Sequence, residues 1–192
     1  NRMRRQQTGD RMEDLARRAN QLADRQQEIE KRIAGAYPAS QDDKPAPANP
    51  QRDRELGDAK DALRQDYEQL EHDMQAAARA MAGSQPQASS QVRSALGEAQ
   101  QDEIKLRLQY GADLVRKGLG AFQAPRERVV TQMMRRLGER MERARQSASA
   151  GPGDDAQKRE AIETALSQIE RARRALSQPG QESGQQGRGS QG

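Results

Sequence analysis

The chain has 192 residues, enough for one domain, but it contains only three tyrosines, one phenylalanine and no tryptophan. Hydrophobic residues make up 32% of the sequence and charged residues another 32%, whereas soluble domains are typically about 45–50% apolar. This composition excludes a thick globular core and favours thin helical layers. The formal net charge of +4 is smaller than the clustered excess of a strongly basic nucleic-acid binder. The absence of cysteine excludes disulfides, thiolate catalysis and zinc–thiolate sites.

Two stretches of the N-terminal half carry apolar residues in alternating steps of three and four, which is the heptad pattern of a coiled coil. The first seam contains Met12, Leu15, Ala19, Leu22, Gln26, Ile29 and Ile33. The second seam contains Leu56, Lys60, Leu63, Tyr67, Leu70, Met74, Ala77 and Met81. We therefore predict coiled-coil helices over residues 1–34 and 51–82. Gln26 is a polar interruption of the kind that fixes the register of paired helices.

Residues 35–50 separate the two seams and contain four prolines, which prevent a continuous helix and favour a semi-stiff linker. Residues 1–33 carry nine basic and six acidic side chains (+3), whereas residues 51–82 carry five basic and eight acidic ones (−3). The two helices are thus electrostatically complementary. We predict an antiparallel coiled-coil hairpin, because it closes a smaller loop than a parallel return. The seams alone leave open whether the helices pair within one chain or between chains.

Further helices are predicted after the hairpin, in a segment over residues 88–150 with a turn near residues 118–125. Every second residue from Ile104 to Tyr110 is apolar, as in a strand. We nevertheless predict helix there, because helix formers flank the stretch and no partner strand is visible elsewhere in the sequence. Pro125 suits the first turn of the helix that follows.

A last helix is predicted over residues 154–177, with Ile162, Leu166, Ile169 and Leu176 on one side. Residues 178–192 consist mostly of Gln, Gly and Ser. Such a tail has too few apolar side chains to offset the conformational entropy that it would lose on ordering, so we expect disorder. The predicted fold class is all-α: an antiparallel coiled-coil hairpin, further helices and a disordered C-terminal tail.

No motif for catalysis, cofactor binding or metal binding emerges from the residue spacing. His72 is the only histidine and lies on the outer face of the second seam. The Glu-x-x-His pattern of di-iron helices fails because Gln69 occupies the position of the glutamate. The run Gly118-Leu119-Gly120 lacks the further glycine of a dinucleotide fingerprint and follows a predicted helix. We therefore predict a protein that is not an enzyme and that has no cofactor, metal or small-molecule substrate.

A basic helix over residues 125–146 is the best candidate for contact with an anionic partner. Its arginines include Arg126, Arg128, Arg135, Arg136, Arg140 and Arg143. No aromatic residue is interleaved with them to stack on bases, which makes nucleic acid the weaker interpretation. The Val and Met side chains of this helix favour an anionic membrane surface, although Trp and Phe are absent from it. Ordinary surface pairs also fit, since Glu139 and Arg143 are four residues apart.

Two stretches carry a resemblance to known proteins. The stretch SQVRSALGEAQQDEIKLRLQYGADLVRKGLGAFQAPRERVVTQMMRRLGERM, residues 90–141, resembles the distal helical part of large, membrane-anchored bacterial proteins of unknown function. The stretch LARRANQLADRQQEIEKRI, residues 15–33, resembles their Gln- and Arg-rich coiled-coil segments. The resemblance implies a bacterial cell envelope setting, with the membrane anchor outside this segment, and it supplies no catalytic residues. Because the chain begins with Asn1, we expect a fragment or a processed product.

The leading interpretation of the sequence is a structural or scaffolding helical segment that mediates protein–protein association, with itself or with other proteins. The alternative is a module that binds an anionic membrane surface or nucleic acid through residues 125–146.

Overall fold

The computed structural model describes residues 2–38, 49–149, 162–171 and 173. The chain divides into two units, residues 1–149 and residues 150–192. The first unit consists of five helices: α1 (Arg2–Ala36), α2 (Pro50–Met81), α3 (Pro86–Gln101), α4 (Ile104–Arg116) and α5 (Gly120–Ser149). The described residues contain no strand, and the predicted all-α class is confirmed. Most of the predicted linker, the start and end of the predicted last helix, and the predicted tail over residues 178–192 lie outside the described residues.

The helix ends differ from the sequence predictions by small amounts that have local causes. Gly35 lies inside α1, which continues to Ala36 instead of ending at residue 34. The second helix begins at Pro50, because Asn49 caps it by accepting a hydrogen bond from the Arg52 backbone N–H at 3.1 Å. The predicted turn near 118–125 is shorter, at residues 117–119, so that Pro125 lies inside α5 and not in its first turn.

Helices α1 and α2 run antiparallel. Arg18 of α1 contacts Asp73 of α2 at 2.8 Å, and Arg25 contacts Asp66 at 2.5 Å. Partner numbers in α2 therefore fall as residue numbers in α1 rise. However, α1 makes its most extensive contact with α5, not with α2. The structure thus does not confirm a two-stranded coiled coil, and both seams contribute to a core that other helices share.

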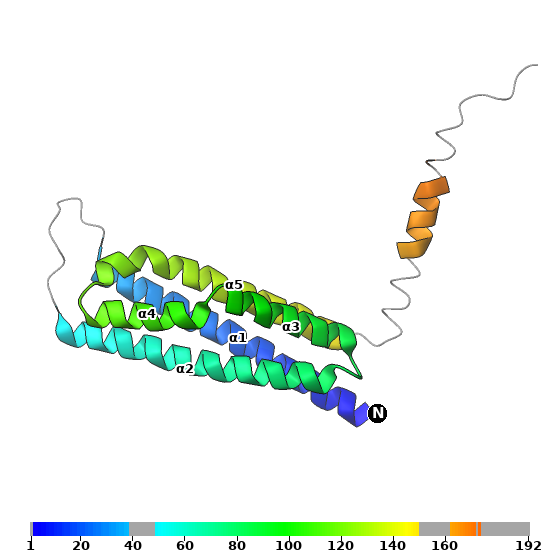
Figure 1. Cartoon of the computed structure of the whole chain (residues 1–192), viewed down its shortest axis with the longest axis horizontal. Coiled ribbons are helices and arrows are strands. Elements are labelled where there is room, and N and C mark those ends of the chain that lie inside the picture. The colour runs from blue at the N-terminus through cyan, green and yellow to red at the C-terminus, as the bar shows by residue number, and fades with distance from the viewer. Residues whose placement is uncertain (1, 39–48, 150–161, 172, 174–192) are drawn as a thin grey trace, which may run out of the picture. The chain divides into compact units, whose positions relative to one another are not determined.

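Helices α3 and α4 together form one broken column between α2 and α5 (Figure 1). Ser89 of α3 donates a hydrogen bond to the Ala78 carbonyl of α2 at 2.7 Å. Further along, Arg116 of α4 contacts Asp58 of α2 at 2.8 Å. The first unit is therefore an antiparallel bundle of four columns, α1, α2, α3 with α4, and α5, and each column is packed against its neighbours along the chain.

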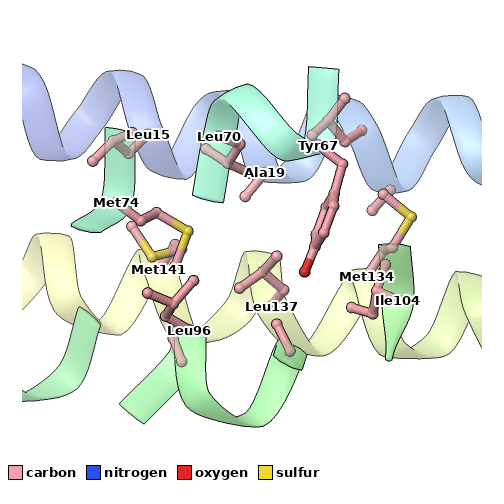
Figure 2. Close-up of a cluster of buried hydrophobic side chains, with 14 of the residues drawn as sticks. Leu15, Ala19, Tyr67, Leu70, Met74, Leu96, Ile104, Met134, Leu137 and Met141 are labelled. Atoms are coloured by element: carbon pink, nitrogen blue, oxygen red, sulfur yellow. The ribbon is translucent and has the colours of Figure 1, made fainter. Parts of the chain in front are cut away.

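The core runs along the inside of the bundle and draws side chains from all five helices. Figure 2 shows Leu15 of α1, Leu70 of α2, Leu96 of α3, Ile104 of α4 and Met141 of α5 gathered into one cluster. The predicted seam residues are all buried: Met12, Leu15, Leu22, Ile29, Ile33, Leu56, Leu63, Tyr67, Leu70, Met74 and Met81. Heptad spacing thus identified the buried faces of α1 and α2 correctly, because any helix in a bundle buries one stripe.

Glu103 separates α3 from α4 within the column that these two helices form, which we call the third column. Its backbone lies in the left-handed region, with φ of 55° and ψ of 35°, which disfavours a side chain with a Cβ atom. Arg107 compensates in part, since its Nε donates to the Asp102 carbonyl at 2.9 Å. The break separates two helices where the sequence predicts one continuous helical segment.

A polar cluster joins the end of α1 to the starts of α2 and α5. The Tyr37 hydroxyl donates a hydrogen bond to Asp53 of α2, and Arg52 lies over the Tyr37 ring at 4.6 Å from its centre. Burial and the hydrogen bond to Asp53 raise the pKa of Tyr37. The ring covers the first residue of α5, Gly120, where an added Cβ would lie only 2.0 Å from a ring carbon. Glycine is therefore required at this contact.

The second unit is helical over its described residues 162–171. Its Ile162, Leu166 and Ile169 side chains are all exposed. These side chains recur at steps of four and three, so they form one apolar stripe.

The ion pair between Arg18 and Asp73 predicts a dependence of stability on pH. The hydrogen bond from Arg18 is the main cause that lowers the pKa of Asp73 from its ordinary value of 3.8. The stabilising contribution is therefore complete above that value and is lost as the pH falls through the lowered pKa of the folded state. Urea unfolding between neutral and strongly acidic pH should show a smaller acid loss in Asp73→Asn. We expect a difference below about 1 kcal/mol, because both side chains are partly exposed.

The variant Arg18→Gln should reduce the acid loss in the same way, because it removes the same hydrogen bond. An acid loss equal to that of the unaltered protein in both variants would show that this pair does not contribute.

The left-handed backbone conformation of Glu103 predicts a stabilising substitution. Glu103→Gly should raise the free energy of unfolding by about 1 kcal/mol, since glycine adopts this conformation without steric cost. The matched control is Gln109→Gly at an exposed position inside α4, which should lower stability by a similar amount. Urea unfolding of both variants measures the difference. Equal destabilisation by the two substitutions would mean that position 103 is an ordinary helical residue.

Candidate functional site

Two ionisable side chains of opposite charge type are completely buried in the centre of the bundle. Lys60 of α2 and Glu127 of α5 are both 0% exposed, and Lys60 Nζ lies 2.7 Å from Glu127 Oε2. A buried charge is costly unless it is paired and hydrogen-bonded, because the protein interior solvates it poorly. The pair therefore imposes a strict condition on how α2 and α5 pack.

Two glutamines complete the hydrogen bonding of the Glu127 carboxylate. Gln26 of α1 donates from Nε2 to Glu127 Oε2 at 2.6 Å. Gln123, one turn earlier on α5, donates from Nε2 to Glu127 Oε1 at 2.6 Å. We call Gln26, Lys60, Gln123 and Glu127 the buried cluster. It connects three columns through one carboxylate.

The remaining column approaches the buried cluster through a glycine. Gly111 of α4 faces it, and an added Cβ would lie 2.6 Å from Lys60 Cε and 2.8 Å from Gln123 Nε2. A side chain at position 111 would thus push the ammonium or the amide away from the carboxylate. All four columns therefore meet at this point, and each contributes either a polar side chain or the space for one.

The electrostatics of the buried cluster follow from its burial. Burial lowers the pKa of Lys60, while the charge of Glu127 and the hydrogen bond to it act in the opposite direction. The amide oxygens of Gln26 and Gln123 accept no hydrogen bond from any described residue. The buried cluster therefore brings one ammonium, one carboxylate and two amides into contact, and this arrangement specifies how the helices pack.

Sequence spacing separates the members of the buried cluster: Gln26 and Lys60 belong to the two predicted seams, and Gln26 is predicted to fix the register of paired helices. The structure joins Gln26 to α5 instead, and Glu127, one of the few acidic residues in the basic stretch, is the acceptor. One signal could have identified it: Glu127 falls at helical spacing with the apolar Val130 and Met134.

The arginines predicted to contact an anionic partner are partly engaged inside the bundle. Arg135 contacts Asp24 of α1 at 2.8 Å, and the pairs Arg136 with Asp102 and Arg140 with Glu98 connect α5 to the third column. Arg126 donates to the Phe122 carbonyl at 2.9 Å. Arg128 and Arg143 are exposed and form no ion pair among the described residues. The structure therefore does not gather these six side chains into one free basic site.

A different surface feature extends over α4, the turn at residues 117–119 and the first turns of α5. Five large hydrophobic residues are exposed there: Leu106, Tyr110, Leu119, Phe122 and Val129. Elsewhere in the described part of residues 1–149, Met3 is the only exposed large hydrophobic side chain. Tyr110 and Phe122 are 60% and 66% exposed, so two of the four aromatic residues of the chain face solvent.

His72 is exposed, as its position on the second seam predicted; its side chain is 77% accessible. Among the described residues, no group of His, Cys, Asp and Glu is arranged to hold a metal ion. No helix in the described part of the chain has the length and apolar character to cross a membrane. Comparison with protein-family models, curated proteins and solved structures produced no match to this chain.

The buried cluster predicts strong coupling between Lys60 and Glu127. Lys60→Met and Glu127→Met should each lower the free energy of unfolding by about 3–5 kcal/mol, because each leaves one buried charge without its partner. The double variant should lose less stability than either single variant, since it removes both charges. Denaturant unfolding of the four proteins measures the coupling. Additive losses would show that the two side chains are not paired in the folded protein.

The exposed pair Arg25 and Asp66 supplies the control for this cycle. The same substitutions there should show a coupling below about 1 kcal/mol, because water screens the two charges.

Proposed function

We propose that the helical bundle over residues 1–149 is a rigid scaffold that mediates protein–protein association. The observation that most supports this function is the placement of the aromatic residues. The chain has few of them for its core, yet Tyr110 and Phe122 lie on the outside of neighbouring helices. Aromatic side chains are enriched at the centres of protein interfaces, where burying them contributes much of the binding energy.

The interior of the bundle supports the scaffold role in a second way. Interhelical ion pairs join the columns, and the buried cluster allows one packing arrangement, because any shift of register would leave Lys60 or Glu127 without its partner. A surface on such a bundle is preorganised. Little conformational entropy is then lost when a partner binds, which favours affinity.

Binding of an anionic membrane surface or nucleic acid through residues 125–146 is the second proposal. Three of the arginines on which it rests, Arg135, Arg136 and Arg140, pair with acidic residues of the same bundle. The bacterial envelope setting implied by the resemblance stays a prediction. Co-sedimentation with anionic vesicles and retention of nucleic acid across a salt series would measure these activities directly.

Site-specific photocrosslinking tests the scaffold function. A photoreactive benzoylphenylalanine in place of Phe122 should give discrete protein adducts in cells that produce the full chain, because its side chain lies on the proposed interface. The same group in place of Arg54, an exposed residue of α2, is the matched control and should give few adducts. Mass spectrometry then identifies the partner, including a second copy of the chain. Equal labelling at the two positions, or no protein adduct at 122, would contradict the proposal.

A further inference from the structure

The exposed apolar residues of α5 lie on its side toward the third column. Phe122, Val129 and Arg136 are spaced by seven residues, which is close to two helical turns, so they follow one line along α5. Arg136 reaches Asp102, the residue between α3 and α4, at 3.1 Å. The same line at Phe122 and Val129 therefore borders α4.

The exposed apolar residues of α4 lie at the same level of the bundle. Gly111 packs against Gln123 and Glu127 of α5, so Tyr110 is at the height of the residues just after Phe122. The side of α4 that faces α2 is marked by Arg116, which pairs with Asp58 and Asp61. Tyr110 lies about a third of a turn away from Arg116, on the outside. Leu106 precedes Tyr110 by one turn on the same stripe.

We call Leu106, Tyr110, Phe122 and Val129 the α4–α5 face. Its apolar side chains come from two antiparallel neighbours and extend over about two helical turns. This is the arrangement on which an amphipathic helix packs, with its own apolar residues recurring every three or four positions. A fifth helix laid along the α4–α5 face would continue the packing of the bundle.

The charged residues around the α4–α5 face determine which net charge of a partner helix is favoured. Three exposed basic residues border it, Arg107, Lys117 and Arg126, against two exposed acidic ones, Glu103 and Asp113. Arg116 lies 4.0 Å from the Asp113 carboxylate, but it pairs more closely with Asp58 and Asp61 and is not counted among the three. The free charge next to the face is therefore positive, which favours an acidic partner and disfavours a second copy of the same face.

The surface that continues from the α4–α5 face toward α3 argues against a lipid bilayer as the partner. Glu98 and Asp102 lie there, paired with Arg140 and Arg136 and still partly exposed. An anionic bilayer is broad enough to meet these carboxylates as well as the apolar residues, whereas one helix on the α4–α5 face avoids them. We propose, on the basis of the scaffold function, that the α4–α5 face binds an acidic amphipathic helix of a partner protein.

Selection from a displayed library of short helical peptides with randomised surfaces tests this proposal on the full chain. The selected peptides should be amphipathic helices with net negative charge. In fluorescence anisotropy with a labelled selected peptide, the Tyr110→Ser/Phe122→Ser variant should bind at least about tenfold more weakly, because it removes two aromatic contacts at the centre of the interface. Arg107→Glu/Arg126→Glu should also weaken binding, by charge repulsion.

Two control variants separate this effect from a general loss of apolar or basic surface. Met3→Ser removes an exposed apolar residue elsewhere, and Arg54→Glu reverses a charge on α2; both should bind the peptide like the unaltered protein. Circular dichroism should give the same helicity for all variants. A selection that returns no acidic amphipathic helix, or peptides that bind the Tyr110→Ser/Phe122→Ser variant equally well, would overturn the proposal.

Two further measurements test whether a lipid bilayer or a second copy of the chain binds the α4–α5 face instead. Binding to vesicles of phosphatidylcholine and phosphatidylglycerol that is lost in Tyr110→Ser/Phe122→Ser would assign the α4–α5 face to lipid and overturn the proposal. A concentration-dependent dimer lost in the same variant would assign it to self-association, with the same consequence. Protein adducts at position 122 together with a failed selection would leave the scaffold function standing while rejecting an acidic helix as its partner.

Discussion

The pairing of Lys60 with Glu127 is the constraint to which the rest of the bundle conforms. Neither side chain reaches solvent, so the fold tolerates the two charges only while they stay in contact and keep the donors from Gln26 and Gln123. An apolar contact loses stability gradually when helices slide, but a buried charge loses its partner at once. The cluster therefore selects one register for α1, α2 and α5, and Gly111 fits α4 to the same point.

Around this fixed centre, the apolar core is modest and its residues are mostly aliphatic. Leu, Ile, Val, Met and Ala side chains supply most of it, together with Tyr37 and the fully buried Tyr67. Such side chains fill the space between helices without specifying it closely, because many registers bury similar area. The interhelical pairs of Arg18 with Asp73 and Arg140 with Glu98 reinforce one arrangement at the surface. Hydrophobic burial thus drives the helices together, and the polar contacts stabilise one packing arrangement over others that bury a similar apolar area.

The different roles of hydrophobic burial and polar contacts explain what could be predicted from sequence. Heptad spacing located the buried stripes of α1 and α2, because burial of one helical face depends on local periodicity alone. It did not identify α5 as the main neighbour of α1, since periodicity marks the face that is buried and not the helix that covers it. The break at Glu103 was also missed, because a left-handed glutamate has no propensity signal. The ion pair joins residues 67 positions apart in sequence, and only the folded chain brings them together.

Phe122 illustrates how a small error in a helix boundary changes a functional interpretation. With the helix start predicted near Pro125, the basic helix contained no Phe, and its arginines were the natural candidates for a binding surface. In the structure, α5 begins at Gly120, five residues before Pro125, although the proline donates no hydrogen bond and its ring crowds the preceding turn. Phe122 then belongs to α5 and contributes, with Tyr110 of α4, to the exposed apolar residues of the bundle. The arginines further along stabilise the bundle, and the surface with unburied apolar area moves to the other end of the helix, next to the cluster that holds all four columns in place.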